Sequence, residues 1–180
     1  MRAQVGPGIG LLALLAVGAV VMPPRAAHAQ PRIGDAAPGL VGGNGNDDLR
    51  SGRPVAVAER LVIVEFFATW CSACQRSLND TLAVHAQLPP DDAAKVAIVV
   101  VDVGEAPDDV RRFFAQQRVP EHVAVVADVD RSRYRAWGAT RLPTAFVVDG
   151  HGRIRHINRG HGPGFRARLG RWLGRCLGEN

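Results

Sequence analysis

Two cysteines separated by two residues stand where an apolar run meets a helix-like segment, and they constrain the fold more than any other feature. Cys71 and Cys74 directly follow the β-branched run 61–67 and the short link after it. A buried strand holds such a turn rigid, and the N-terminus of the following helix leaves unpaired N–H groups and a partial positive charge beside the first sulfur. A thiol whose pKa falls from about 8.5 to about 7 is roughly half ionised at neutral pH. We therefore expect Cys71 to be a reactive thiolate.

A structural disulfide and a metal-binding pair are the alternatives for these cysteines. By the loop-entropy relation, a bridge that closes so short a loop adds only about 2 kcal/mol of stability, against about 3 kcal/mol for a 15-residue loop. Zinc sites normally use four ligands, and no second cysteine pair or His-x-x-x-His follows at finger spacing. Two soft thiolates also suit copper(I), so copper binding is the alternative to redox chemistry that stays open.

The first 29 residues have the pattern of an export signal. Arg2 precedes an apolar stretch over 9–22, which a proline pair ends, and residues 27–29 form a small-x-small cleavage site. The mature chain should then begin at Gln30 and lie in the periplasm or another exported location, where disulfides persist. The apolar stretch is shorter than the about 20 residues that a membrane span needs. An uncleaved membrane anchor is therefore the less favoured alternative to a cleaved signal.

Residues 30–180 have the length of one domain, and no internal repeat or long linker divides them. The formal net charge of the whole chain is +5, and loss of Arg2 and Arg25 with the signal lowers it to +3. The remaining arginines are scattered among acidic residues rather than gathered in a run. This pattern argues against nucleic acid as a partner. We also expect a monomer.

Short β-branched runs alternate with helical stretches, which predicts an α/β fold with parallel strands and crossover helices. The predicted parallel strands are Leu61–Phe67, Val96–Asp102 and His122–Ala127. The predicted helices between and after them cover 74–88, where Pro89-Pro90 is the stop, then 107–117 and 130–137. Asp149-Gly150-His151-Gly152 indicates a hairpin between strands 144–148 and 153–158, followed by a last helix from about Pro163 to Leu177.

Two further sets of residues invite a chemical role. Cys176 falls on the apolar stripe of the last helix, so we expect a small buried side chain, with a resolving or dimerising thiol as the alternative. His151, His156 and His161 recur every five residues. That spacing matches neither one helix face nor one strand face, so we predict no metal site there.

Several separated motifs together resemble the thioredoxin superfamily, and more narrowly the exported TlpA/ResA-like thiol-disulfide oxidoreductases. They are Glu65-Phe66-Phe67-Ala68-Thr69-Trp70-Cys71-Ser72-Ala73-Cys74, then Arg141-Leu142-Pro143-Thr144 before a strand, the Asp149-Gly150 hairpin, and the lead-in Gly34-Asp35-Ala36-Ala37-Pro38. The resemblance implies a three-layer thioredoxin-like fold, with a mixed sheet between helices. Residues 122–137 would be the strand-helix insertion of the TlpA type. The dipeptide Ser72-Ala73 and Asn79 depart from common family residues, so the redox potential does not carry over.

The resemblance also implies roles for individual residues. Cys71 would attack a partner disulfide, and Cys74 would resolve the mixed disulfide that forms. Glu65 would serve Cys74 as a proton acceptor, since the family often carries an acid on this strand. Alternation along the strand places Glu65 on the same face as Ile63 and Leu61, in apolar surroundings that raise the pKa of a carboxyl.

Three more residues would bind the substrate. Trp70 should lie against the dithiol and form part of the docking surface. The loop that contains Leu142 and Pro143 resembles the family's cis-proline loop, and a cis bond would bring the backbone of Leu142 beside Cys71. An extended segment of a substrate could then pair with that backbone.

The function that follows is disulfide exchange with exported proteins, without an organic cofactor. TlpA/ResA-like proteins mostly act as reductants, for example on apocytochrome c or on copper-site assembly proteins. The resemblance therefore implies a reductase that receives electrons from a membrane thiol donor. Copper(I) handling through the same cysteines is the runner-up, and a peroxidase of the peroxiredoxin kind is a third possibility that explains the lead-in but not the Cys-x-x-Cys arrangement.

Overall fold

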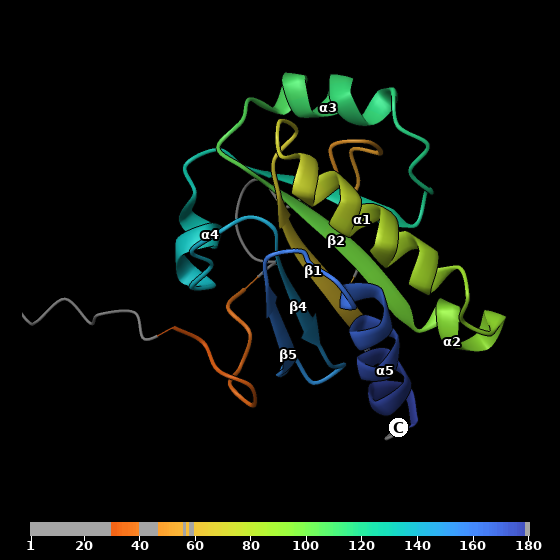
Figure 1. Ribbon diagram of the computed structural model, residues 1–180. Helices are drawn as coiled ribbons and strands as arrows, with labels where there is room; N and C mark the ends of the chain where they lie inside the picture. Colours follow the sequence, from red (N-terminus) through yellow and green to blue (C-terminus); the bar gives the residue numbers. More distant parts are fainter. Residues whose placement is uncertain (1–29, 40–46, 56, 58–59, 179–180) are drawn as a thin grey trace, which may run out of the picture.

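A five-stranded sheet forms the centre of the computed structural model (Figure 1). The structure describes residues 30–39, 47–55, 57 and 60–178. The predicted signal over 1–29 lies outside the described residues. The spatial order of the strands is β3-β2-β1-β4-β5. β1 to β3 are parallel, and β4 and β5 continue the sheet antiparallel. The strands are β1 (Leu61–Phe67), β2 (Val96–Val103), β3 (Val123–Asp128), β4 (Thr144–Val148) and β5 (Ile154–Arg159).

Helices cover both faces of this sheet, which confirms the predicted three-layer architecture. They are α1 (Ser72–His85), α2 (Pro90–Ala94), α3 (Pro107–Ala115), α4 (Ser132–Ala136) and α5 (Phe165–Gly178). Apolar residues of α1, α3 and α5 share one core cluster with one face of the sheet. Trp137, which directly follows α4, belongs to the cluster on the other face. Figure 1 shows α1 and α5 side by side over the sheet. Right-handed crossovers place α1 and α3 on the same face, since β1, β2 and β3 follow one another in one direction.

The central strand β1 is paired on both sides and completely buried. Its seven residues pair with β2 on one side, and residues 62–66 pair with β4 on the other. Strands covered on both faces read as continuous apolar runs. For that reason the bounds 61–67 and 144–148 could be predicted to the residue, and the structure confirms both.

Two short segments of the lead-in lie along the two edges of the sheet. At β5, the Gly34 amide donates to the Ile154 carbonyl at 2.7 Å, and a bridge joins Ala36 to Arg153. At β3, the Leu49 amide donates to the Val125 carbonyl at 2.7 Å, and the Val125 amide donates to the Asp48 carboxylate at 2.8 Å. The described lead-in therefore covers part of both outer strands.

The helices differ from the sequence-based expectation at several ends: α1 ends at His85 rather than at Leu88, and α3 ends at Ala115 rather than at Gln117. The active-site helix begins at Ser72 rather than at residue 74, because Cys71 itself is its N-cap residue. The proline pair does more than end a helix, because Pro90 is the first residue of α2. At that position the missing N–H of proline costs no hydrogen bond. Asp91 and Asp92 occupy the first turn of α2, where the helix dipole favours negative charge.

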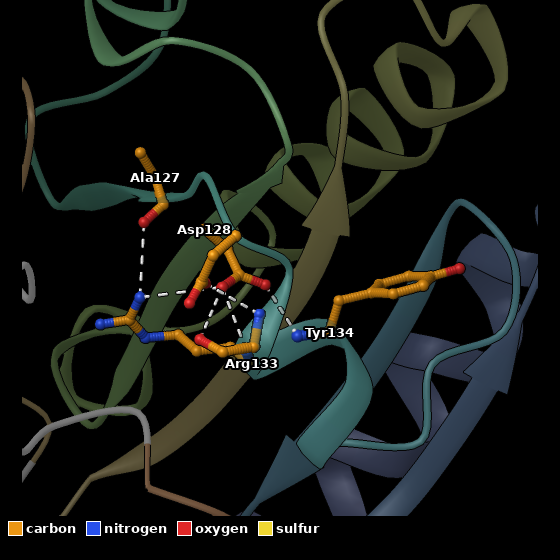
Figure 2. A network of polar contacts seen from close by, with 6 residues as sticks. Ala127, Asp128, Arg133 and Tyr134 are labelled. Carbon is orange, nitrogen blue, oxygen red and sulfur yellow. Dashed lines mark hydrogen bonds and ion pairs between the residues drawn. The ribbon is translucent and has the colours of Figure 1, made fainter.

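A buried carboxylate fixes the strand-helix insertion at its turn (Figure 2). Asp128 ends β3 and is 1% exposed. Its carboxylate accepts hydrogen bonds from the amides of Arg133 at 3.0 Å and Tyr134 at 2.8 Å, and from the Ser132 hydroxyl at 3.3 Å. The Arg133 guanidinium lies 4.0 Å from the same carboxylate and also donates to the Ala127 carbonyl at 3.4 Å. Asp128 thus satisfies amides at the start of α4 that would otherwise lack partners.

Candidate active site

The dithiol lies at the junction between the central strand and α1, as predicted. Cys71 and Cys74 are joined in a disulfide with their Cα atoms 5.2 Å apart. The Cys74 amide donates to Cys71 Sγ at 3.1 Å, so the side chain of Cys71 caps the helix. A reduced Cys71 would meet the same amide and the positive end of α1, both of which favour the thiolate.

The two sulfurs differ in access. Cys71 is 8% exposed, whereas Cys74 is completely buried. Cys74 lies on the inner face of α1 together with Ser77, Leu78 and Thr81, at the i, i+3, i+4 and i+7 positions that face a core. An attacking partner can therefore meet Cys71 first.

Glu65 is completely buried on β1, beneath the α1 face that carries Cys74. Thr81 Oγ1 donates to Glu65 Oε2 at 3.1 Å, while Oε1 has no donor among the described residues. Burial raises the pKa of Glu65 to about 7, and the Asp80 carboxylate acts in the same direction, against the neighbouring hydroxyls of Ser77 and Thr81. The Ser77 hydroxyl makes no hydrogen bond of standard geometry in the described structure. A carboxyl that gains and loses its proton near pH 7 is suited to proton transfer.

The predicted substrate-binding residues Trp70, Leu142 and Pro143 differ in their surroundings. Trp70 is 70% exposed, so its ring is available at the surface rather than packed in the core. The Leu142-Pro143 bond is cis, as the resemblance implied. Leu142 packs against the core cluster that contains both cysteines. The Pro143 carbonyl accepts from the Gly160 amide at 2.7 Å, which ties this loop to the end of β5.

One contact at the active-site turn was not predicted from the sequence. Glu105, in the loop after β2, accepts from the Thr69 amide at 2.6 Å and from Thr69 Oγ1 at 2.5 Å. The Thr69 carbonyl accepts from Gln75 Nε2 of α1 at 2.8 Å. All three polar groups of Thr69 are therefore engaged, one residue before Trp70. A sequence separation of 36 residues left no local signal for this contact.

A buried carboxyl, that of Asp102, lies against the Glu105 carboxyl. Asp102 is 0% exposed, and neither of its carboxyl oxygens has a hydrogen-bond partner in the described part of the chain. Burial raises the pKa of Asp102 to about 8, and the neighbouring Glu105 carboxyl also raises it, against the Glu105 backbone amide, which lowers it. The sequence predicted this residue only as the end of a strand.

The other candidate residues have separate surroundings. His161 lies 2.9 Å from Asp80 of α1, His156 stacks on Trp172, and His151 is exposed in the hairpin. Within the described ranges, no three His, Cys, Asp or Glu side chains are grouped so that they could hold a metal ion. Cys176 is buried on α5, 7% exposed, and forms no disulfide there, in agreement with the expected core position.

A mixed sheet with helices on both faces, a Cys-x-x-Cys pair at the strand-helix junction and a cis-proline loop define a thioredoxin-like protein with a redox-active site. The family model for Redoxin matches residues 33–168, and the chain belongs to that family.

Curated relatives are thiol-disulfide exchange proteins. The chain is 29% identical over 99 residues to the thiol-disulfide oxidoreductase ResA of Geobacillus thermodenitrificans, covering 55% of this chain and 54% of ResA. It is 30% identical over 107 residues to the thiol:disulfide interchange protein HelX of Rhodobacter capsulatus, covering 59% and 52%. The chain thus spans about half the length of the curated relatives it matches.

Solved structures agree on the fold. A candidate thiol:disulfide interchange protein DsbE from Chlorobium tepidum superposes with a TM-score of 0.68 at 24% identity, covering 82% of this chain and 99% of the other. StoA from Bacillus subtilis superposes with a TM-score of 0.52 at 18% identity, covering 64% and 83%. Among the described residues, no helix has the length and apolar character that crossing a membrane requires.

Proposed function

We propose that this protein is an exported thiol-disulfide oxidoreductase that exchanges disulfides with other proteins through Cys71 and Cys74. The observation that carries the proposal is the pairing of a partly accessible, helix-capping Cys71 with a buried Cys74 above a buried carboxyl. The similarity to ResA and HelX supports the same chemistry.

In the reductive direction, the Cys71 thiolate attacks a disulfide of the substrate. A mixed disulfide forms and one substrate thiolate leaves. Cys74 then loses its proton and attacks Cys71 Sγ, which closes the 71–74 disulfide and releases the second substrate thiolate. Glu65 accepts the Cys74 proton, a role that its burial and its pKa of about 7 support. Two electrons and two protons from a donor dithiol restore the reduced pair.

Trp70, Leu142 and Pro143 form the substrate-binding surface in this proposal. The exposed Trp70 ring offers apolar contact beside the nucleophile. The backbone before Pro143 offers hydrogen-bonding groups to an extended segment of the substrate, in the manner of an added strand.

We further propose a cleaved signal over 1–29, a mature monomer over 30–180, and action as a reductase in cytochrome c maturation or a similar process. An exported dithiol is oxidised by its compartment unless electrons are supplied, so this direction requires a membrane thiol donor as partner. Action on protein thiols needs no organic cofactor.

Trapping of mixed disulfides tests the exchange chemistry. The Cys74→Ser variant, produced in its host, should accumulate covalent adducts with exported proteins that dithiothreitol releases. The Cys71→Ser variant should form none, and the control Cys176→Ser should exchange disulfides as wild type does. Absence of adducts with Cys74→Ser, together with tight binding of copper(I) by the reduced wild type, would instead establish a copper-binding module. Peroxide consumption by the reduced protein would favour the peroxidase.

The reduction potential of the Cys71–Cys74 couple tests the direction. Equilibration in glutathione buffers, followed through Trp70 fluorescence, should give a value near or below about −230 mV for a reductase. A value near about −120 mV would indicate an oxidant of folding proteins.

A further inference from the structure

Resting on the proposed redox function, we infer that Glu105 is a positioning residue for the dithiol, and that Asp102 keeps Glu105 in place by sharing one proton with it. The carboxyl pair stands outside the proton transfer assigned to Glu65. It acts on the peptide that leads into the nucleophile.

The contact with Thr69 provides the geometric basis. Glu105 uses one carboxylate oxygen for the Thr69 amide at 2.6 Å and the other for the Thr69 hydroxyl at 2.5 Å. Hydrogen bonds to an ionised acceptor are shorter and about twice as strong as neutral ones. Thr69 precedes Cys71 by only two residues, so this bidentate contact fixes the turn from which the sulfur projects. The Gln75 bond to the Thr69 carbonyl fixes the same peptide from the side of α1.

The chain after β2 is shaped to bring Glu105 to this position. Gly104 has a φ of +85°, a conformation that residues with a Cβ rarely adopt. A Cβ there would come within 2.6 Å of Arg131 Nε, so the Arg131 side chain lies directly against Gly104. The Gly104 amide donates to the Asp128 carbonyl at 3.0 Å, which anchors the loop to β3.

The state of Asp102 follows from its surroundings. An ionised carboxylate that is completely buried needs donors, and among the described residues no hydrogen bond of standard geometry reaches Asp102. The backbone amide of Glu105 acts to lower the pKa of Asp102, but burial and the Glu105 carboxyl, which raise it, outweigh that amide. A protonated Asp102 is itself a donor, and its neighbour Glu105 is an ionised acceptor. The pair then carries a charge of −1 and one shared proton. The raised pKa of Asp102, about 8, agrees with this arrangement.

Among the described residues, the charged groups on the elements near the pair lie beside the loop, on the neighbouring strand or at the surface. Arg131 lies against Gly104, and Glu65 lies on the same face of the neighbouring strand. On α3, the ion pairs Asp108–Arg111 and Asp109–Arg112 are at the surface, and Arg76 of α1 is exposed. When the pair releases its proton to solvent, its charge becomes −2 and the two carboxylates repel each other. The Thr69 contact should then weaken as the pH rises through about 8.

Nuclear magnetic resonance of the oxidised protein tests the shared proton, because the disulfide removes the thiol titrations of Cys71 and Cys74. The Thr69 amide signal should lie far downfield and shift with pH through an inflection near 8. In Asp102→Asn the carboxamide donates permanently to Glu105, so the signal should stay downfield and lose this inflection. In Glu105→Gln the signal should move upfield. An inflection that persists in Asp102→Asn would overturn the proposal.

Alkylation of reduced Cys71 by iodoacetamide at pH 7 tests positioning without a change of charge. Thr69→Val removes the hydroxyl contact and should slow alkylation about three- to tenfold, the scale of one hydrogen bond, while Thr69→Ser should restore the rate. Equal rates in both variants would show that the contact does not position the sulfur. If the Thr69 signal behaves as expected but the wild type exchanges no disulfides with proteins, the proposed function fails and the assignment of the carboxyl pair stands.

Discussion

Asp102 and Asp128 occupy corresponding ends of two neighbouring parallel strands, yet their surroundings are opposite. Both are buried, at 0% and 1% exposure. Asp128 accepts hydrogen bonds from two amides and a hydroxyl (Figure 2), whereas no hydrogen bond of standard geometry from the described residues reaches Asp102. Asp128 fixes the turn between β3 and α4, and it is distant in the sequence from Cys71 and Cys74. Asp102 lies beside the residue that holds the active-site turn. The comparison shows that burial alone does not define a carboxyl's role; the donors around it do.

We expect the largest loss of stability from a substitution of Asp128. Asp128→Ala leaves the amides of Arg133 and Tyr134 without their acceptor and should lower the free energy of unfolding by about 3 to 4 kcal/mol. Urea denaturation measures it. Asp130→Ala, at an exposed residue of the same turn, is the control and should cost much less. An equal loss of unfolding free energy in both variants would show that the buried carboxylate of Asp128 has no special structural role.

The difference in unfolding free energy between Asp102→Asn and wild type should change with pH by about 2 to 3 kcal/mol. Because the folded-state pKa of Asp102 is about 8, above the ordinary 3.8, its stabilising contribution is complete below pH 3.8 and is lost as the pH rises through 8. The variant should therefore gain stability relative to wild type between pH 4 and pH 9. Urea denaturation at both pH values gives the difference. Asn at Asp128 should instead destabilise at both, and a flat difference for Asp102→Asn would contradict the assignment.

In Glu65→Gln the unfolding free energy relative to wild type should also rise with pH, but by only about 1 to 2 kcal/mol. The effect is smaller because Thr81 already donates to one carboxyl oxygen of Glu65. The folded-state pKa of about 7 exceeds the ordinary 4.5, so the stabilising contribution is lost between these pH values. The variant should gain on wild type between pH 4 and pH 8 in the oxidised protein. Thermal unfolding across this range is the measurement, and Thr81→Val is the matched variant that leaves the carboxyl in place.

The smallest effect should come from Ser132→Ala, about 0.5 kcal/mol, since the Ser132 hydroxyl is the most distant of the three donors to Asp128, at 3.3 Å. A loss as large as that of Asp128→Ala would mean that the hydroxyl, rather than the two amides, satisfies the carboxylate. Urea midpoints of the two variants decide between them.

Local sequence patterns were sufficient to predict the strands, the crossover helices and the position of the dithiol. The run 61–67 is apolar except for Glu65 because both faces of β1 are covered, and this pattern predicts the first and last residues of the strand. The Cys-x-x-Cys motif and the Leu142-Pro143 loop predicted the site through resemblance to a family, and the cis bond agrees.

Contacts between distant residues could not be predicted in this way. Nothing near Glu105 in the sequence indicates that it meets Thr69, because the contact depends on the register of β1 against β2. Asp102 likewise resembled an ordinary polar residue at the end of a strand. Pro90 was interpreted as a stop, although at the first position of α2 it is compatible with a helix.

Both outer strands carry a segment of the lead-in, residues 34–36 on β5 and residues 48–49 on β3. Unpaired strand edges invite addition of foreign strands and aggregation. In the proposed function the protein would meet partly unfolded substrates, which could add to such an edge. With both edges partly occupied by its own backbone, this molecule leaves less of the sheet open to strand addition, and in the proposed function an extended substrate would meet the accessible Cys71 instead.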